Sequence, residues 1–395
     1  MRPVVLIPGI GGSILVQKGN EFRRLFHKSV PDNRWVNIYV ATKVGLQNWK
    51  RDMQCTLRHN HDGRLIGIKP AHPLTSFDFG GTKGVKDIIP EFLLFPQQYQ
   101  TILEELFHHR YFHFLADALH GVGYEDHVSV FGAPYDFRFI LDPSIRTHYF
   151  DQLRYLFEKK CAMRGEKTVV VTHSLGGIIF KWFLGECVSQ DWIDQHIEHW
   201  VCISAPFGGS YNAVCAASSG EHYIASMRSQ VQSELQKNSG IIACLPNDLA
   251  FHVDEPLVHL GSDDVSTITL GMYKTLGDDG ALPFKIWEDL FKEHLDNVIK
   301  PPLRVSTTIV CATRKASTPG VAYSEKWDAV PYHTDMCEGD GIVPLRSLMS
   351  AEKILDRKHV VENIYQGLDH TTLLSDPRVI KLVKKHACFK SPESI

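Results

Sequence analysis

The chain has 395 residues, of which 44% are hydrophobic and 22% are charged, and its formal net charge at neutral pH is −3. This composition is typical of a globular protein with a large core, and it excludes a disordered chain. The small negative charge also argues against a nucleic-acid partner. Nine cysteines without Cys-x-x-Cys spacing favour thiols in a reducing compartment, although one pair such as Cys311 and Cys337 could still bridge.

The first apolar run, PVVLI at residues 3–7, is expected to form a buried strand. No signal peptide precedes it, and we therefore expect an intracellular protein. The run continues into PGIGGS at residues 8–13, whose glycines would let backbone N–H groups approach a ligand. A phosphate-binding loop is the alternative, but the Walker lysine and the G-x-G-x-x-G spacing are both missing.

Strand patterns then alternate with helical periodicity along the chain. Further strands are expected at 128–131, 168–172, 200–204, 304–311 and 359–365, and helices at 101–120, 144–164 and 175–189. This alternation predicts an α/β fold with a mostly parallel, doubly wound sheet, formed by one unit that spans residues 1–395. Two long, irregular insertions follow strands, and we expect them to form a lid (about 14–100) and a cap (about 207–300).

The stretch TVVVTHSLGGIIFKW at residues 168–182 has the pattern of a strand, a sharp turn and a buried helix. Ser174 lies on the turn, where its hydroxyl would stand clear of the sheet as a candidate nucleophile. The match to G-x-S-x-G is partial, because Thr172 replaces the first glycine.

An acid and a base follow Ser174 in the order that serine hydrolases on open α/β sheets use. Asp340 lies between two glycines in EGDGIVPLRS, and His370 lies in YQGLDHTTLL after the last expected strand. A neutral imidazole would accept the serine proton, and the carboxylate would hold that imidazole in the correct tautomer. The oxyanion that forms needs two backbone N–H groups, for which we predict Leu175 and Ile10.

Other residues could compete for these roles. Asp136 is a rival acid, but it precedes the serine and has Arg138 as a close salt-bridge partner; Asp369 is a second rival, directly beside His370. We interpret His173 as a packed core histidine, because neighbours on a strand point to opposite faces. Finally, we interpret Cys202 as a buried, inert thiol, and the pair His109 and His113, whose spacing can bind zinc, as a helix face.

Four motifs taken together resemble the lecithin:cholesterol acyltransferase family. They are FGAPYDFR (131–138), HSLGG (173–177), SAPFGGS (204–210) and GDGIVP (339–344). The family includes secreted sterol acyltransferases, lysosomal phospholipases and plant phospholipases A. The resemblance implies a triad of Ser174, Asp340 and His370 and an oxyanion loop at Pro8–Gly12. With Cys55 as its single cysteine, the lid segment cannot form the lid disulfide of the secreted members, which favours the intracellular plant-type enzymes.

The sequence thus predicts an α/β-hydrolase that cleaves acyl esters of glycerophospholipids through an acyl-serine. An acyltransferase that passes the acyl group to a sterol or another lipid alcohol is the alternative, and a lipid-binding protein without catalysis is a third hypothesis. No cofactor, metal site or transmembrane segment is expected. Residues 21–52 carry a net charge of +4 and the aromatic residues Trp35 and Trp49, and we predict that this lid segment docks on membranes.

Overall fold

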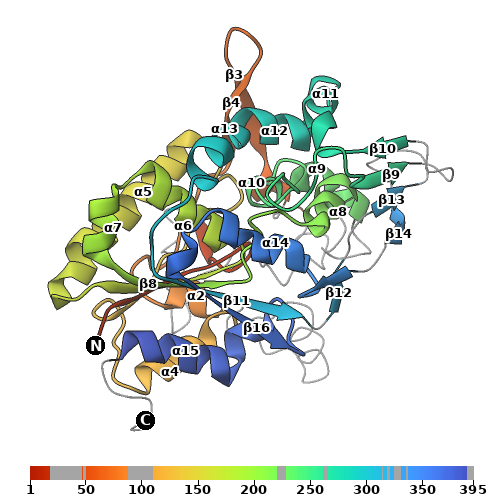
Figure 1. The fold of residues 1–395 in the computed structure, drawn as a ribbon. Helices are drawn as coiled ribbons and strands as arrows, with labels where there is room; N and C mark the ends of the chain where they lie inside the picture. The colour runs from red at the N-terminus through yellow and green to blue at the C-terminus, as the bar shows by residue number, and fades with distance from the viewer. Residues whose placement is uncertain are drawn as a thin grey trace, which may run out of the picture.

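The computed structural model describes residues 1–17, 47, 50–87, 110–219, 228–260, 266–313, 315–317, 321–323, 331–334 and 337–388. A six-stranded sheet lies at the centre of the molecule (Figure 1). Its strands, in spatial order, are β16 (Val360–Gln366), β11 (Thr307–Thr313), β8 (Ile197–Ile203), β7 (Thr168–His173), β1 (Val4–Ile7) and β6 (Val130–Gly132). All five pairings are parallel, which confirms the predicted sheet and its six strands.

Both faces of the sheet are covered, so its central strands are apolar along their whole length. Strand β1 packs on both sides: Val5 and Ile7 lie in the core on one face of the sheet, and Val4 and Leu6 lie in the core on the other face. The first face is covered by α5 (Pro143–Tyr155), α6 (Leu175–Glu186) and α7 (Gln190–His196). The second face is covered by α4 (His113–His120) and α15 (Pro377–Ala387).

The helix expected over 144–164 changes its winding before it ends. Helix α5 begins after Asp142, whose side chain caps it by accepting from the Ser144 N–H, and Pro143 occupies the first turn. After Tyr155 the chain continues as a π-helix and then as a short 3₁₀ turn. Gly165, with φ 68°, ends it in the left-handed conformation that glycine adopts without strain.

Residues 207–300, for which we predict a cap, have an irregular sequence pattern but are largely helical in their described part. Their helices are α8 (Tyr211–Ser219), α9 (Arg228–Leu235), α10 (Ser239–Ile242), α11 (Tyr273–Asp278), α12 (Leu282–Leu290) and α13 (Lys292–His294). In α12 the residues Phe284, Trp287 and Leu290, which are three residues apart, are all buried. A small mixed sheet lies beside these helices, formed by β10 (Ser266–Ile268), β9 (Val258–Leu260), β13 (Val321–Tyr323) and β14 (Pro331–Thr334).

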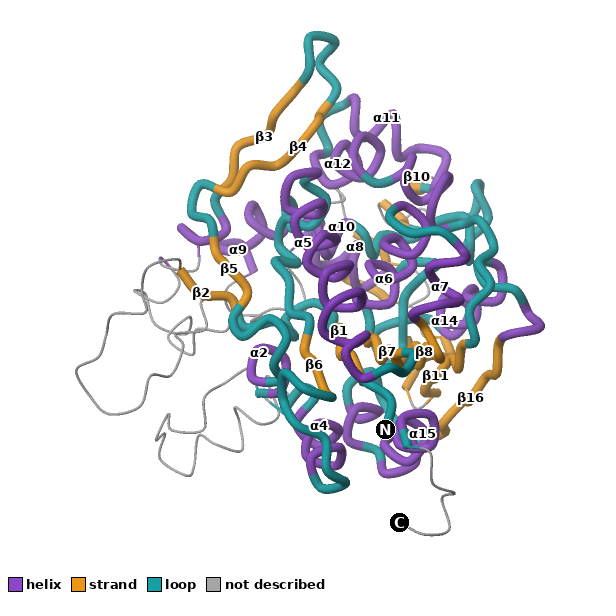
Figure 2. Tube along the Cα trace, turned by 90° about the vertical axis from the view of Figure 1, so that its left-hand side faces the viewer, coloured by secondary structure: helices purple, strands orange, loops and turns teal. Residues whose placement is uncertain are grey.

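The described part of residues 14–100 contributes short strands outside the central sheet. The strands are β2 (Leu15–Gln17), which pairs with β5 (Leu74–Ser76), and β3 (Cys55–His59), which forms a hairpin with β4 (Leu65–Pro70). The same range also contains the short helix α2 (Lys83–Lys86). Figure 2 shows the β3–β4 hairpin projecting from the body of the molecule. Its two strands are held by Asp142, which accepts from Arg58 and from the Ile68 N–H, each at 2.8 Å. Its tip is held by Asp289 of α12, which accepts from the Leu65 N–H at 2.8 Å.

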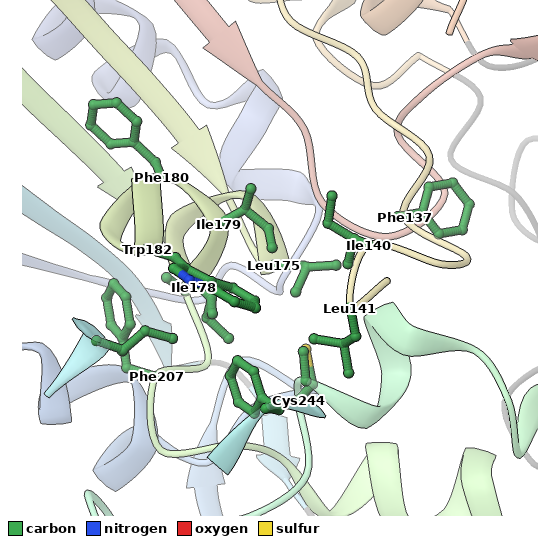
Figure 3. Close-up of a cluster of buried hydrophobic side chains, with 14 of the residues drawn as sticks. Phe137, Ile140, Leu141, Leu175, Ile178, Ile179, Phe180, Trp182, Phe207 and Cys244 are labelled. Carbon is green, nitrogen blue, oxygen red and sulfur yellow. The ribbon is translucent and has the colours of Figure 1, made fainter. Parts of the chain in front are cut away.

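An apolar core joins the start of α6 to the segment that follows α10. Figure 3 shows Leu175 and Ile178 of this helix in one apolar cluster with Ile140, Leu141 and Cys244. Each of these side chains is almost fully buried. Because this cluster has contributions from three separate segments, it fixes the N-terminus of α6 and the turn that precedes it.

Candidate active site

Ser174 lies on the turn between β7 and α6, as the sequence predicts. Its backbone has φ 54° and ψ −129°, a left-handed conformation that non-glycine residues adopt at a cost in energy. The turn is held in place because the Ser174 N–H donates to the carbonyl of Ile203 in the neighbouring strand, at 2.9 Å. A strained serine between a parallel strand and a helix is the geometry of a nucleophile elbow.

The packing around the elbow explains why Gly176 must be a glycine and why Thr172 can replace the first glycine of the usual motif. A Cβ atom on Gly176 would lie 2.6 Å from the carbonyl oxygen of Ile7, so α6 packs against β1 without room for a side chain. Thr172, which replaces the first glycine of the motif, lies in β7 and accepts a hydrogen bond from the Trp200 indole at 2.9 Å. The threonine is therefore a satisfied strand residue, and its presence leaves the turn intact.

The structure brings Asp340 and His370 together, as predicted. His370 Nδ1 lies 2.7 Å from Asp340 Oδ2, and the His370 N–H donates to the Asp340 carbonyl at 2.9 Å. The second carboxylate oxygen accepts from the N–H groups of Ile342, at 3.0 Å, and Val343, at 2.8 Å. Asp340 is fully buried, so these donors replace water around its carboxylate. An acceptor at Nδ1 leaves Nε2 of His370 as the nitrogen that can take a proton.

His370 is tied to the elbow through the residue that precedes Ser174. His173 Nε2 lies 2.8 Å from the carbonyl oxygen of His370, and the two imidazole rings have centroids 4.8 Å apart. Within the described part of the chain, the Ser174 hydroxyl makes no hydrogen bond. Such bonds are often absent before substrate binds and form in the substrate complex.

The two residues predicted for the oxyanion hole also lie close together. A Cβ atom built on Gly240 of α10 would lie 3.0 Å from a methyl group of Leu175 and 3.3 Å from Cγ1 of Ile10. Leu175 is the first residue of α6, where a backbone N–H has no partner inside the helix. Ile10 lies in a tight turn that is closed by a hydrogen bond from the Gly12 N–H to the Gly9 carbonyl, at 3.2 Å.

Both rival acids have structural partners. Asp136 forms a two-pronged ion pair with Arg138, at 2.8 and 2.7 Å, and both side chains are largely buried. Asp369 accepts from the N–H groups of Thr371 and Thr372, at 3.2 and 2.9 Å, and thereby caps the turn after His370. The pKa of Asp369 is lowered, since these hydrogen bonds outweigh its partial burial. The structure therefore gives each rival a local role.

His173 is buried, as predicted, but its polar contacts were not foreseen. Besides the His370 carbonyl, it is hydrogen-bonded to the hydroxyl of Tyr111. Burial lowers the pKa of His173 well below its usual range, which keeps the imidazole neutral. No motif marks Tyr111 in the sequence. Cys202 is also buried, and desolvation raises the pKa of its thiol to about 12, as expected for an inert cysteine.

Four further expectations concern metals and membranes. Across the described residues, no group of three or more His, Cys, Asp or Glu side chains is arranged to hold a metal ion. His113 is instead paired with Asp87 and Asp117, at 2.8 and 3.1 Å, whereas His109 lies outside the described residues. Helices in the described ranges are all too short or too polar to cross a membrane. Trp35 and Trp49 lie outside the described residues.

Comparison with known proteins gives consistent matches. The family model for lecithin:cholesterol acyltransferase matches residues 100–267. Lecithin-cholesterol acyltransferase-like 4 of Arabidopsis thaliana is 25% identical, over 100% of this chain and 76% of its own length. Human lysosomal phospholipase A and acyltransferase is 24% identical, over 97% of this chain and 90% of its own length. Rabbit (Oryctolagus cuniculus) phosphatidylcholine-sterol acyltransferase is 27% identical, over 56% of this chain and 47% of its own length.

A solved structure supports the fold. A chain in the crystal structure of the Tle4–Tli4 complex aligns with 98% of this chain and 97% of its own length, with a TM-score of 0.52 and 13% identity. The parallel six-stranded sheet and the strained serine turn are those of an α/β-hydrolase. With the sequence matches and the four motifs in agreement, this α/β-hydrolase enzyme is similar to the lecithin:cholesterol acyltransferase family.

Proposed function

We propose that this protein is a phospholipase A-type serine hydrolase, which removes an acyl group from a glycerophospholipid through an acyl-enzyme on Ser174. The observation that carries the proposal is the hydrogen bond from His370 to the buried carboxylate of Asp340, in a loop tied to a strained serine turn. These three side chains are the nucleophile, base and acid that acyl transfer requires. A lipid-binding protein without catalysis would have no need of the strained turn.

The reaction proceeds in two halves. The Ser174 oxygen attacks the ester carbonyl while His370 Nε2 accepts the hydroxyl proton, and the N–H groups of Ile10 and Leu175 stabilise the negative oxygen that forms. Collapse of this intermediate releases the lysophospholipid alcohol, which takes the proton from His370, and leaves an acyl ester on Ser174. Water, which gives a proton to His370, then attacks that ester. The fatty acid is released, and the proton returns from His370 to Ser174.

The identity of the acyl acceptor separates the two leading hypotheses. Hydrolysis uses water, whereas an acyltransferase uses the hydroxyl of a sterol or another lipid alcohol in the same second step. Among the relatives, one is named as a phosphatidylcholine-sterol acyltransferase and another as both a phospholipase A and an acyltransferase. Since the triad takes part in both reactions, product analysis with and without a sterol decides between them.

The lid and the cap are proposed to serve access to lipid. Residues 14–100 would form a membrane-binding lid around Trp35 and Trp49, and residues 207–300 a cap over the acyl group. Support for the cap comes from α10, since a Cβ atom on its Gly240 would touch the side chains of both Ile10 and Leu175. The proposed intracellular location is supported by Cys311 and Cys337, which are both unbridged thiols.

The test uses mixed vesicles of phosphatidylcholine and an anionic phospholipid, with and without a sterol. Release of fatty acid in both samples supports the phospholipase, whereas a sterol ester that forms at the expense of fatty acid supports the transferase. Labelling by a fluorophosphonate, which reacts with activated serines, should require Ser174. A protein that binds the vesicles but yields neither product nor label is a lipid-binding protein, and the proposal would then be wrong.

A further inference from the structure

A chain of buried hydrogen bonds runs from the loop after β1 to His370. The Gly9 N–H donates to the Tyr111 hydroxyl at 2.9 Å, this hydroxyl is hydrogen-bonded to His173 Nδ1, and His173 Nε2 lies 2.8 Å from the His370 carbonyl oxygen. We infer that Tyr111 and His173 are positioning residues, which hold the oxyanion loop and the base His370 in register with Ser174. This inference rests on the proposed function.

The direction of each hydrogen bond follows from the groups at the two ends. A carbonyl oxygen can only accept, so His173 must carry its proton on Nε2. In the neutral imidazole Nδ1 is then an acceptor, and the Tyr111 hydroxyl donates to it. The hydroxyl oxygen in turn accepts from the Gly9 N–H. Each donor in this series of three hydrogen bonds has an acceptor, and one tautomer of His173 satisfies all three bonds.

The packing around Tyr111 makes this chain stiff. Tyr111 is 6% exposed and His173 is 1% exposed. A Cβ atom on Gly9 would lie 2.6 Å from Cβ of Ser174 and 3.0 Å from the Tyr111 hydroxyl, and one on Gly12 would lie 2.6 Å from Cζ of Tyr111. The tyrosine ring therefore supports the oxyanion loop at two glycines, and the same loop touches the serine.

The consequence is that His370 is held at its backbone as well as at its ring. Asp340 bonds both the ring and the N–H of His370, while His173 bonds its carbonyl oxygen. Proton transfer from Ser174 depends on the position of His370 Nε2, and a displacement of about 1 Å can lower the rate about a hundredfold. A histidine that only filled the core could have any hydrogen-bond partner. Tyr111 and His173 instead bond to Gly9 and His370, which both lie in loops of the proposed site.

Three substitutions separate positioning from packing. Tyr111→Phe keeps the ring but removes the acceptor of the Gly9 N–H and the donor to His173. His173→Gln keeps an N–H that reaches the His370 carbonyl, whereas His173→Asn is one methylene shorter and does not reach it. The readouts are kcat and KM on a soluble short-chain ester, the rate of fluorophosphonate labelling, and the thermal midpoint of unfolding.

We expect Tyr111→Phe and His173→Asn to lower kcat and the labelling rate by about 30- to 100-fold, with KM changed less than about twofold. His173→Gln should stay within about fivefold of the wild type, because the hydrogen bond to His370 is restored. The double variant Tyr111→Phe/His173→Asn should lose about as much as the worse single variant, since the two residues act in series.

Several results would overturn the inference. They are a kcat within about threefold of wild type for both Tyr111→Phe and His173→Asn, equal losses for the Gln and Asn variants, and losses in rate that simply follow the fall in thermal midpoint. The wild-type protein gives an independent measurement if the variants do not fold. Nitrogen-15 histidine spectra should show His173, identified by its contacts with Tyr111, neutral and protonated at Nε2. A proton on Nδ1 would contradict the chain of bonds.

The labelling arm also separates this inference from the proposed function. If the fluorophosphonate fails to label the wild-type protein at Ser174, both are wrong. If it labels the wild type but the positioning variants react equally fast, the acyl-serine proposal stands and only the role of Tyr111 and His173 is wrong.

Discussion

The two sides of Ser174 are built from different chemical groups. On the acid–base side, the side chains of Asp340 and His370 face each other, and every oxygen of the carboxylate has a donor. On the oxyanion side, the proposed groups are backbone N–H groups of Ile10 and Leu175, and their positions depend on what packs around the turns. The acid–base side can therefore be changed by replacing a side chain, whereas the oxyanion side responds to changes in packing and glycine content.

Ser174→Ala breaks both sides at once, because it removes the oxygen that each of them serves. Turnover should fall on the order of a million-fold, while the fold and the thermal midpoint are retained, since only a hydroxyl is lost. The measurement is ester hydrolysis by purified protein together with fluorophosphonate labelling. Activity above about a hundredth of wild type would show that another residue is the nucleophile.

Asp340→Asn tests the acid–base side by itself. The amide oxygen should replace Oδ1 as the acceptor for the Ile342 and Val343 N–H groups, so the NH₂ group faces His370 Nδ1. The imidazole must then carry its proton on Nε2, and kcat should fall about ten-thousand-fold with little change in KM. His370→Ala should be at least as damaging.

Asp136→Asn and Asp369→Asn are the matched controls for this prediction. Each removes one buried or half-buried carboxylate that has only local partners. Both should keep most of the catalytic rate, although the loss of the ion pair to Arg138 should lower the thermal midpoint. If one of the control variants is inactive while Asp340→Asn remains active, the catalytic acid is the residue replaced in that control.

Gly9→Ala tests the oxyanion side. The added methyl would lie 2.6 Å from Cβ of Ser174 and 3.0 Å from the His173 carbonyl, so we expect the loop to move and to displace the Ile10 N–H. Loss of one oxyanion donor costs about 100- to 1,000-fold in kcat. Gly121→Ala is the control, since its φ of −60° suits any residue and its nearest neighbour is 3.3 Å away. A Gly9→Ala enzyme with nearly full kcat would show that the loop does not form the oxyanion hole.

Replacing Trp35 and Trp49 together by alanine probes a part of the chain that belongs to neither side. Hydrolysis of anionic vesicles should fall strongly, because aromatic rings anchor proteins at the lipid interface. Hydrolysis of a soluble short-chain ester, which needs no docking, should be spared. Equal losses on the two substrates would mean that the tryptophans are structural and that the lid prediction is wrong.

Chelation should have the smallest effect. If N–H groups stabilise the oxyanion, EDTA should leave the rate on the soluble ester unchanged, and added calcium should not raise it. A rate that EDTA abolishes and calcium or zinc restores would mean that the oxyanion side depends on a metal ion.

Much of this molecule could be predicted from local patterns. Apolar runs of β-branched residues marked the six strands, and the turn at Ser174 followed from a strand that passes directly into a glycine-bearing helix. The order of Ser174, Asp340 and His370 along the chain was sufficient to propose the triad, and the structure pairs the acid with the base. Most helices of residues 207–300 were missed because they are short and interrupted by turns, which weakens their periodicity.

By itself, the sequence determined the sheet, the serine turn and the three candidate residues of the triad, since each depends on short-range periodicity or on a glycine at a tight turn. Only the tertiary structure placed Tyr111 against Gly9 and His173 against the His370 carbonyl. No local sequence pattern indicates the hydrogen-bond partner of a tyrosine or histidine. Gly9 lies 102 residues from Tyr111, and His370 lies 197 residues from His173. Such contacts arise when separate segments pack into one core, because each buried polar group must find a partner there.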